Sequence, residues 1–381
     1  MADNPVEWLS KEHKFAGFEM INDQLQLQVA AGMTEFKLEH QDRFHATNAE
    51  GMLEHRMAFT IQSRILNEKG FYNGFDATIV KNMPTDLQIG DISLKELEIR
   101  LQSPPQPWNT PGSPTAGYEQ IRAKYDQELT ADLIKVHDTD QRLFYKLVAL
   151  YQSVIDPLLA PDHRQSVMDI LKTELDGDVR RQRFYNNQAI TRVEAFNLLD
   201  SVDRPRAVLK HYRTNDETKD QQETYSRWLI VNYEKPANEY GTRELRNFGA
   251  GWGFDHRNDI SRFNLEFSDD KHFERFLRDI EKGHKVGVPP VDKTEHEMLY
   301  FYVNIQRKTF TIEDGSGELV KHDRYLTEMA KQERSERNSN TQNVPTRAIG
   351  PASDKSDDDQ KKNDQRERIV GPDREHLGPR K

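Results

Sequence analysis

The chain of 381 residues contains no cysteine, which excludes a disulfide framework, a cysteine nucleophile and thiolate metal ligands. Long apolar stretches are also missing: the most apolar ones, 228–231 and 298–303, are as short as strands. The first residues have neither the basic start nor the apolar core of a secretory signal. We therefore expect a soluble chain without a membrane span, which is cytoplasmic or is secreted without a cleavable signal peptide.

The segment 331–381 has no aromatic residue and only seven aliphatic ones. Such a segment cannot offset the entropy lost on ordering by burying apolar surface, so we predict a disordered charged tail. The tail holds 12 Lys and Arg against 10 Asp and Glu, a net charge of +2, within a chain whose total is −10. The preceding residues therefore carry −12.

The acidic charge of the body argues against broad, non-specific binding to duplex DNA, which requires positive charge to neutralise phosphates. Anionic membranes are disfavoured for the same reason. A local basic groove is still compatible with this composition, because net charge does not determine the charge of one face.

Proline marks the clearest internal boundary, with five prolines in residues 104–114. Because proline lacks a backbone donor and has a fixed φ, we predict a semi-rigid linker here. The predicted fold class is α+β. Its parts are an N-terminal domain of a small antiparallel sheet plus helix (1–102), the linker (103–117), a helical bundle (118–213), a C-terminal antiparallel sheet with a packed helix (225–330), and the disordered tail (331–381).

The N-terminal domain is predicted to have the order β-β-α-β-β. Alternating apolar residues predict a hairpin over 24–39 that turns at Gly32. Thr47 and Glu50 have the spacing of a capping box and predict that a helix begins there. Apolar residues on this helix recur every four positions: Leu53, Met57, Ile61 and Ile65. Two further strands are predicted at 76–81 and 97–101.

Helical periodicity dominates after the linker. It predicts helices over 118–136, 141–155, 163–175 and 180–188. A capping box of Thr191 and Glu194 predicts the start of the next helix.

The C-terminal domain is predicted to be a sheet with one helix. Residues 225–233 are apolar on both faces, which predicts a central strand, and 263–267 predict another strand. Ser268–Asp270 supplies an N-terminal cap for a helix, and 298–312 predict a closing hairpin.

A glycine-aromatic alternation occupies Phe248–Phe254. It lacks the Lys and Ser or Thr of a P-loop and the strand-to-helix context of a dinucleotide fingerprint. We interpret the glycines as a place where another backbone closely approaches one face of a strand. The alternative is a nucleotide or peptide groove beneath them.

Three histidines, His40, His45 and His55, lie near Glu50 and Glu54 in the sequence. On the predicted helix the two glutamates share a face, which is the geometry of a divalent-metal pair. No spacing typical of a metal-binding motif accompanies them. The default interpretation is a solvated helix face, and no metal and no cofactor is predicted.

The densest basic and aromatic stretch of the body contains Arg180, Arg181, Arg183 and Tyr185. These are candidate phosphate- or single-stranded nucleic-acid-binding residues. The favoured interpretation is a charged helix surface that pairs with the abundant acids. No nucleophile, base and orienting group assemble into a recognisable motif, so no catalytic residue is predicted and we lean against an enzyme.

The last seventeen residues space arginines through a hydrophilic, net positive segment. In this composition they resemble the C-terminal signals of type IV secretion substrates. The resemblance implies recognition by a secretion receptor through the basic residues Arg366, Arg368, Arg374, Arg380 and Lys381. The alternative is a tail that only keeps the protein soluble.

Residues 261–277, followed by two predicted strands up to Gly315, form a strand-helix-hairpin pattern. It resembles units in large proteins of conjugative elements and in the single-stranded-DNA-binding effector that plant-transforming bacteria export. The acidic body departs from what a DNA-coating protein requires.

Our leading hypothesis is a non-enzymatic bacterial binding protein (an effector) of a mobile element or type IV secretion system, exported through its tail. Its partner would be a secretion receptor or a host or recipient protein. One alternative is a metal-assisted phosphoesterase or nuclease-like enzyme that uses Glu50, Glu54 and the nearby histidines. Another is single-stranded nucleic-acid binding through Arg180 to Arg183. The sequence leaves partner, substrate and oligomeric state open.

Overall fold

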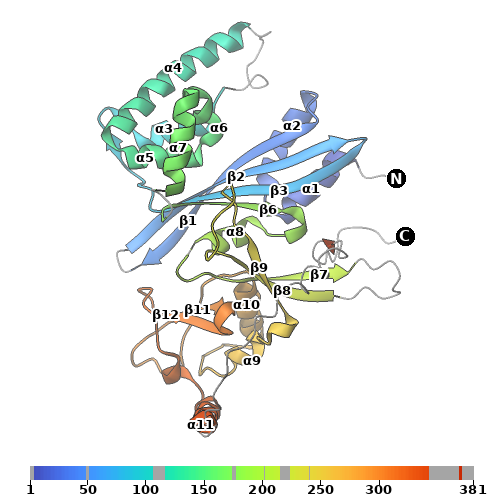
Figure 1. Cartoon of the computed structure of the whole chain (residues 1–381), viewed down its shortest axis with the longest axis vertical. Coiled ribbons are helices and arrows are strands. Elements are labelled where there is room, and N and C mark those ends of the chain that lie inside the picture. The colour runs from blue at the N-terminus through green and yellow to red at the C-terminus, as the bar shows by residue number, and fades with distance from the viewer. Residues whose placement is uncertain are drawn as a thin grey trace, which may run out of the picture. The chain divides into compact units, whose positions relative to one another are not determined.

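The structure is a computed structural model of mixed α+β architecture with antiparallel sheets, as predicted (Figure 1). It describes residues 4–48, 51–105, 116–173, 177–200, 202–214, 224–239, 241–342 and 369–370. No helix in these ranges is long and apolar enough to cross a bilayer.

The chain divides into two compact units. The N-terminal unit joins 1–186 with 190–200 and 232–244, and the C-terminal unit joins 187–189, 201–231 and 245–381. The N-terminal unit contains 23 Lys and Arg against 33 Asp and Glu, a net charge of −10, whereas the C-terminal unit contains 31 of each. The whole net charge of the protein therefore belongs to the N-terminal unit.

A four-stranded antiparallel sheet organises the N-terminal unit, with the strand order β1-β2-β3-β6. Its strands are β1 (Glu35–Asn48), β2 (Gly51–Leu66), β3 (Lys69–Val80) and β6 (Val179–Tyr185). The first three follow one another as a meander, and β6 joins β3 after a long helical excursion. A bulge between Gln62 and Ser63 shifts the register of β2 against β3.

Helices lie on both faces of this sheet (Figure 1). The first face carries α1 (Pro5–Phe15), α2 (Asn22–Ala30) and α8 (Arg192–Leu199). The second face carries a helical layer at one end of the sheet: α3 (Leu94–Gln102), α4 (Ala116–Thr139), α5 (Gln141–Leu150), α6 (Gln152–Ile155) and α7 (Pro161–Thr173). A two-stranded ribbon of β4 (Gln88–Ile89) and β5 (Ile92–Ser93) precedes α3.

Strand periodicity gives the two faces different chemistry. On β2, Met57, Phe59 and Ile61 are buried on the first face, where Phe59 packs edge-on against Phe18. The intervening side chains, which include Thr60 and Gln62, lie on the second face. The first face is therefore the apolar core, and the part of the second face beyond the helical layer is polar.

Two N-terminal predictions are wrong. Residues 24–29 belong to helix α2, because Leu25 and Gln28 are buried three residues apart while Leu27 is exposed. The helix predicted to begin at Thr47 is instead the end of strand β1, followed by strand β2. Residues four positions apart share a face in a helix and also in a strand, so the ladder from Leu53 to Ile65 fits both.

Two further assignments exchange strand and helix. The strand predicted at 97–101 is helix α3, which Ser93 caps by accepting a hydrogen bond from the amide of Glu96. The helix predicted at 180–188 is strand β6, which pairs with β3. The predictions of α4, α5 and α7 are confirmed in type, as is the strand β3. The capping box of Thr191 and Glu194 is also confirmed.

The described residues of the C-terminal unit form two antiparallel sheets. One has the order β13-β7-β8-β9, with β7 (Val208–Thr214), β8 (Thr224–Val231), β9 (Leu245–Gly249) and the two-residue β13 (Ile369–Val370). The other is formed by β10 (Val286–Val288), β11 (Leu299–Asn304) and β12 (Thr309–Glu313). The helices are α9 (His256–Ile260), α10 (Asp270–Glu281) and α11 (Glu328–Gln342).

Most predictions for this unit are confirmed. Strand β8 is central, Asp269 caps α10, and β11 and β12 form the closing hairpin. The strand predicted at 263–267 is wrong, since Phe263 and Leu265 make only isolated bridges.

Helix α11 extends to Gln342, into the segment predicted to be disordered from residue 331. Ala330 in its first turn is buried, and Glu333 lies 3.5 Å from Arg262. Except for β13, residues 343–381 lie outside the described residues, as does 106–115 of the predicted linker.

His13 of α1 is fully buried against the first face of the sheet. Its Nε2 lies 2.8 Å from the hydroxyl oxygen of Ser63, and its ring packs edge-on against Tyr72. Burial lowers the pKa of His13 to about 4, although the nearby side chain of Asn22 opposes this shift. The ring is therefore neutral in the folded protein at neutral pH.

We expect this histidine to lower the stability of the fold as the pH falls from 6.5 towards 4. In that window the unfolded chain protonates His13 while the folded chain does not, so protons favour unfolding. The unfolding free energy should drop by about 2 kcal/mol less in His13→Gln than in the wild type between about pH 7.5 and about pH 5. Urea denaturation at both pH values measures this difference, and equal drops would contradict a buried neutral histidine.

Candidate functional site

A cleft of about 630 Å³ lies on the polar part of the second face, beside the helical layer of the N-terminal unit. Its floor consists of residues from β1, β2, β3 and β6. Residues at the end of α5 and in α6 form one wall, and the segment 238–242 contributes to the rim near β6.

The register of the sheet places the floor side chains in rows that cross all four strands. One row is Glu39, Thr60, Asp76 and Arg183, and the next is Gln41, Ala58, Thr78 and Arg181. Each row joins side chains of the three consecutive strands β1, β2 and β3 with one from β6, which is far from them in the sequence. The floor thus presents hydroxyls, amides and charges of both signs side by side.

The acidic side chains of the cleft are held by neighbouring donors. Asp76 accepts hydrogen bonds from Arg183 at 2.8 Å and from Gln62 at 2.9 Å. On the α6 wall, the hydroxyl of Ser153 donates to Glu39 at 2.7 Å, and Gln152 donates to Asp156 at 2.9 Å. These bonds fix the orientations of the carboxylates before any ligand arrives.

Arginines dominate the β6 side of the floor. Arg183 also stacks over the ring of Tyr185, with its guanidinium carbon 5.6 Å from the ring centre. Burial lowers the pKa of Arg181, and the nearby carboxylates of Asp156 and Asp76 oppose that shift. Arginine stays protonated in proteins, so both side chains carry positive charge into the cleft.

The rim near β6 is anchored through Gln182, whose side chain lies on the opposite face from Arg181 and Arg183. Its side-chain amide donates to the carbonyl of Arg243 and accepts from the amide of Arg243, both at 2.9 Å. A turn closed by Asn238 and Thr242 precedes this anchor. The loop is thereby tied to the strand that supplies the arginines.

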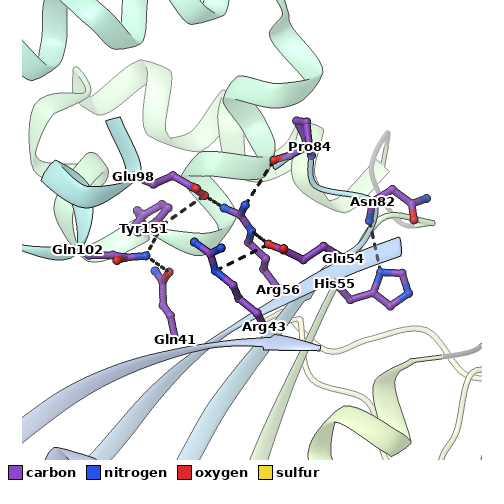
Figure 2. A network of polar contacts seen from close by, with 10 residues as sticks. All are labelled: Gln41, Arg43, Glu54, His55, Arg56, Asn82, Pro84, Glu98, Gln102 and Tyr151. Carbon is purple, nitrogen blue, oxygen red and sulfur yellow. Dashed lines mark hydrogen bonds and ion pairs between the residues drawn. The ribbon is translucent and has the colours of Figure 1, made fainter. Parts of the chain in front are cut away.

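A buried network supports the helical wall of the cleft (Figure 2). Arg56 on β2 is buried between Glu54 of the same strand and Glu98 of α3. Its Nε lies 2.6 Å from Glu54, and it also donates to the carbonyl of Pro84. The guanidinium therefore joins the sheet to the helical layer, because it pairs with one carboxylate from each.

The network continues to the cleft through Gln102 and Gln41. Gln102 donates to the hydroxyl of Tyr151 at 3.1 Å and to the side-chain oxygen of Gln41 at 3.5 Å (Figure 2). Gln41 in turn donates to the carbonyl of Leu150 at 3.1 Å. Burial raises the pKa of Tyr151, so its hydroxyl is neutral and can donate towards Glu98. One set of polar contacts thus runs from the buried ion pair to the cleft floor.

The structure separates the residues of the predicted metal pair. Glu54 is buried against Arg56 on a strand and not on a helix face, and Glu50 lies outside the described residues. His55 points to the first face, 3.6 Å from Asp200, and burial lowers its pKa even though Asp200 opposes the shift. His40 bonds to Arg192 and lies 3.4 Å from Asp42. The part of the chain that the structure describes contains no group of three or more potential metal ligands.

The candidate phosphate-binding residues divide between the faces of β6. Arg181, Arg183 and Tyr185 lie on the cleft side, and Tyr185 is 54% exposed. Arg180 lies on the other face, where it donates to the carbonyl of Leu199. A strand with period two brings alternate residues together, and assigning a helix to this stretch concealed that arrangement.

The close backbone approach predicted at the glycines of Phe248–Phe254 is wrong. Among the residues that the structure describes, a Cβ atom at Gly249, Gly251 or Gly253 would meet nothing within 4 Å. Strand β9 ends at Gly249 and a short 3-10 turn follows, with Gly253 at φ +73° in the left-handed region. Only Gly253 therefore has a conformational reason to be glycine.

The five basic residues of the predicted secretion signal, Arg366 to Lys381, lie outside the described residues. Sequence reasoning missed Glu39, Asp76, Gln41 and Ser153 as cleft residues. The signal that could have revealed three of them is the polar alternation along β1 and β3, which becomes informative only once these segments are known to be strands.

Comparison with known proteins found no protein-family model, no curated protein and no solved structure that matches the chain. The chemistry of the cleft therefore has to be interpreted from its own residues. It offers fixed acceptors, fixed cations, hydroxyls and amides, a set that suits recognition of a polar ligand.

Removal of the buried cation should destabilise the fold strongly. Arg56→Met leaves Glu54 and Glu98 buried without their shared partner, and we expect a loss of about 3–5 kcal/mol in unfolding free energy at neutral pH. The control Arg43→Met removes a 54% exposed arginine 3.8 Å from Glu54 and should cost less than about 1 kcal/mol. Chemical denaturation measures both.

The pH dependence separates this effect from lost packing. Buried carboxylates without a cation have raised pKa values, so they take up protons as the pH falls and the cost of Arg56→Met should shrink. If Arg56→Met and Arg43→Met lowered the unfolding free energy equally, or if the loss in Arg56→Met did not change with pH, Arg56 would stabilise the fold only by packing and not by its charge.

Proposed function

We propose that the chain is a binding protein whose cleft in the N-terminal unit recognises an extended, partly basic segment of a protein partner. The single observation that carries this proposal is the floor of the cleft. It carries charges of both signs, its carboxylates are already oriented by neighbouring donors, and it belongs to a unit of net charge −10. The hypothesis that it belongs to a mobile element or secretion system stays a prediction.

The fixed polar groups favour binding of main-chain and basic side-chain groups. Glu39 and Asp156 are oriented by Ser153 and Gln152, so a ligand would not have to order them on arrival. Polar ligands need such pairing because a buried donor or acceptor without a partner costs free energy. A peptide supplies both donors and acceptors at regular intervals.

The field of the N-terminal unit favours a cationic partner. A net charge of −10 raises the local concentration of positively charged ligands and speeds their association. It opposes polyanions even where Arg181 and Arg183 lie in the cleft.

Selection from a random linear peptide library displayed on phage should yield binders to the immobilised full chain that are rich in Lys and Arg. Thr60→Trp fills the middle of the cleft floor and should weaken the selected peptides by at least about tenfold. The matched control Thr139→Trp adds the same ring at an exposed position at the end of α4 and should bind like the wild type. Fluorescence anisotropy of the labelled peptides measures the affinities.

Two outcomes would overturn the peptide proposal. The first is recovery of no specific binders. The second is equal affinity of Thr60→Trp and Thr139→Trp for the peptides, since that would place the peptides outside the cleft. Circular dichroism and thermal unfolding of both variants ensure that only folded proteins are compared.

Single-stranded nucleic acid is the second candidate ligand, favoured by Arg181, Arg183 and Tyr185 on one side of β6. Bases stack on exposed tyrosine and arginine groups, and phosphates pair with arginine. A labelled oligothymidylate tests it: saturable binding that falls steeply with salt and is lost in Arg183→Gln would favour this candidate over the peptide.

Export through the tail is tested separately. Deletion of residues 366–381 removes the five basic residues of the predicted signal, and we expect transfer into recipient cells to be lost while peptide binding by the cleft is unchanged. A translocation reporter fused to the N-terminus of the chain measures transfer. Unchanged transfer of the truncated protein would remove the secretion hypothesis and leave the binding proposal standing.

A further inference from the structure

The outer edge of β1 carries a side chain that pairs with it as a neighbouring strand would. The amide nitrogen of Gln24 on α2 donates to the carbonyl of Glu39 at 3.1 Å, and its amide oxygen accepts from the amide of Glu39 at 3.4 Å. A primary amide presents a donor and an acceptor like a peptide group, so Gln24 occupies one pairing position of an absent strand.

This contact also shows which main-chain groups of β1 point outward. The ladder of β1 with β2 runs without a register shift, so residues of the same parity as Glu39 direct both main-chain groups away from β2. Lys37, Gln41 and Arg43 belong to this set. Within the part of the chain that the structure describes, no main-chain hydrogen bond from another segment reaches them on this edge.

The same residues form the border of the cleft. Lys37, Glu39 and Gln41 all line it, because the side chains of alternate residues share a face. A strand added beside β1 would extend the cleft floor by one strand. Its alternate side chains would then project on the second face, next to Glu39.

We propose that the partner segment binds by strand addition to the outer edge of β1 at Gln41 and Arg43, with alternate Lys or Arg side chains directed towards the cleft. This inference rests on the proposed function and specifies its geometry. The occupant is a peptide and not a second copy of the chain, because two units of charge −10 repel each other while a basic segment is attracted.

Proline tests the main-chain contact selectively. Gln41→Pro removes an outward amide and leaves the bonds between β1 and β2 in place, since proline is tolerated on the free side of an edge strand. The residue before it, His40, is already in extended conformation. Gln41→Ala is the matched control, because it removes the same side chain and keeps the amide.

The probe is the tightest Lys- or Arg-rich peptide selected on the full chain, with binding measured by fluorescence anisotropy. We expect Gln41→Pro to weaken it by about tenfold relative to Gln41→Ala. Equal affinities of the two variants, with the peptide still sensitive to Thr60→Trp, would overturn strand addition while preserving the proposed cleft function. Failure to select any peptide would overturn both.

Hydrogen exchange on the wild-type chain gives a test that no folding defect can obscure. The amides of Gln41 and Arg43 should exchange fast in the free protein and become protected on peptide addition, while the inward amide of Asp42 is protected throughout. Protection of Gln41 and Arg43 without peptide, accompanied by a dimer in analytical ultracentrifugation, would assign the edge to a second copy and overturn the proposal.

Discussion

The buried arginine of β2 is the interaction on which the N-terminal unit depends. The guanidinium of Arg56 pairs with Glu54 of the sheet and with Glu98 of α3, and all three residues are buried. Burial of a charge costs free energy unless the charge is paired. The cation offsets this cost for both carboxylates, and the two carboxylates offset it for the cation. The contact thereby sets the position of the helical layer over one end of the sheet.

The cleft follows from that position. Helices α5 and α6 cover only part of the second face, and Gln41 and Ser153 connect the covered part with the open part. The floor beyond the helices can be polar because it stays in contact with solvent, whereas the first face is apolar because α1, α2 and α8 cover it. A single sheet thus serves as core on one side and as recognition surface on the other.

Local signals in the sequence located several elements correctly. The capping residues Thr191 and Asp269 mark real helix starts, and the two-sided apolar pattern of 225–233 marks a real central strand. The failures came from patterns that fit two structures. The four-residue ladder of β2 fits helix and strand alike, as do Leu97 and Leu101, which lie four positions apart in α3, and only the partners available in space decide between them.

The sequence by itself determined the α+β composition, the acidic body and the exclusion of cysteine chemistry, because these depend on residue content and local periodicity. Only the tertiary structure decided that Arg183 meets Asp76 across a sheet, that Arg180 does not join it, and that Gln24 occupies the edge of β1. The physical reason is distance along the chain. Strand pairing between residues that are a hundred positions apart sets which side chains share a face, and no local pattern encodes that register.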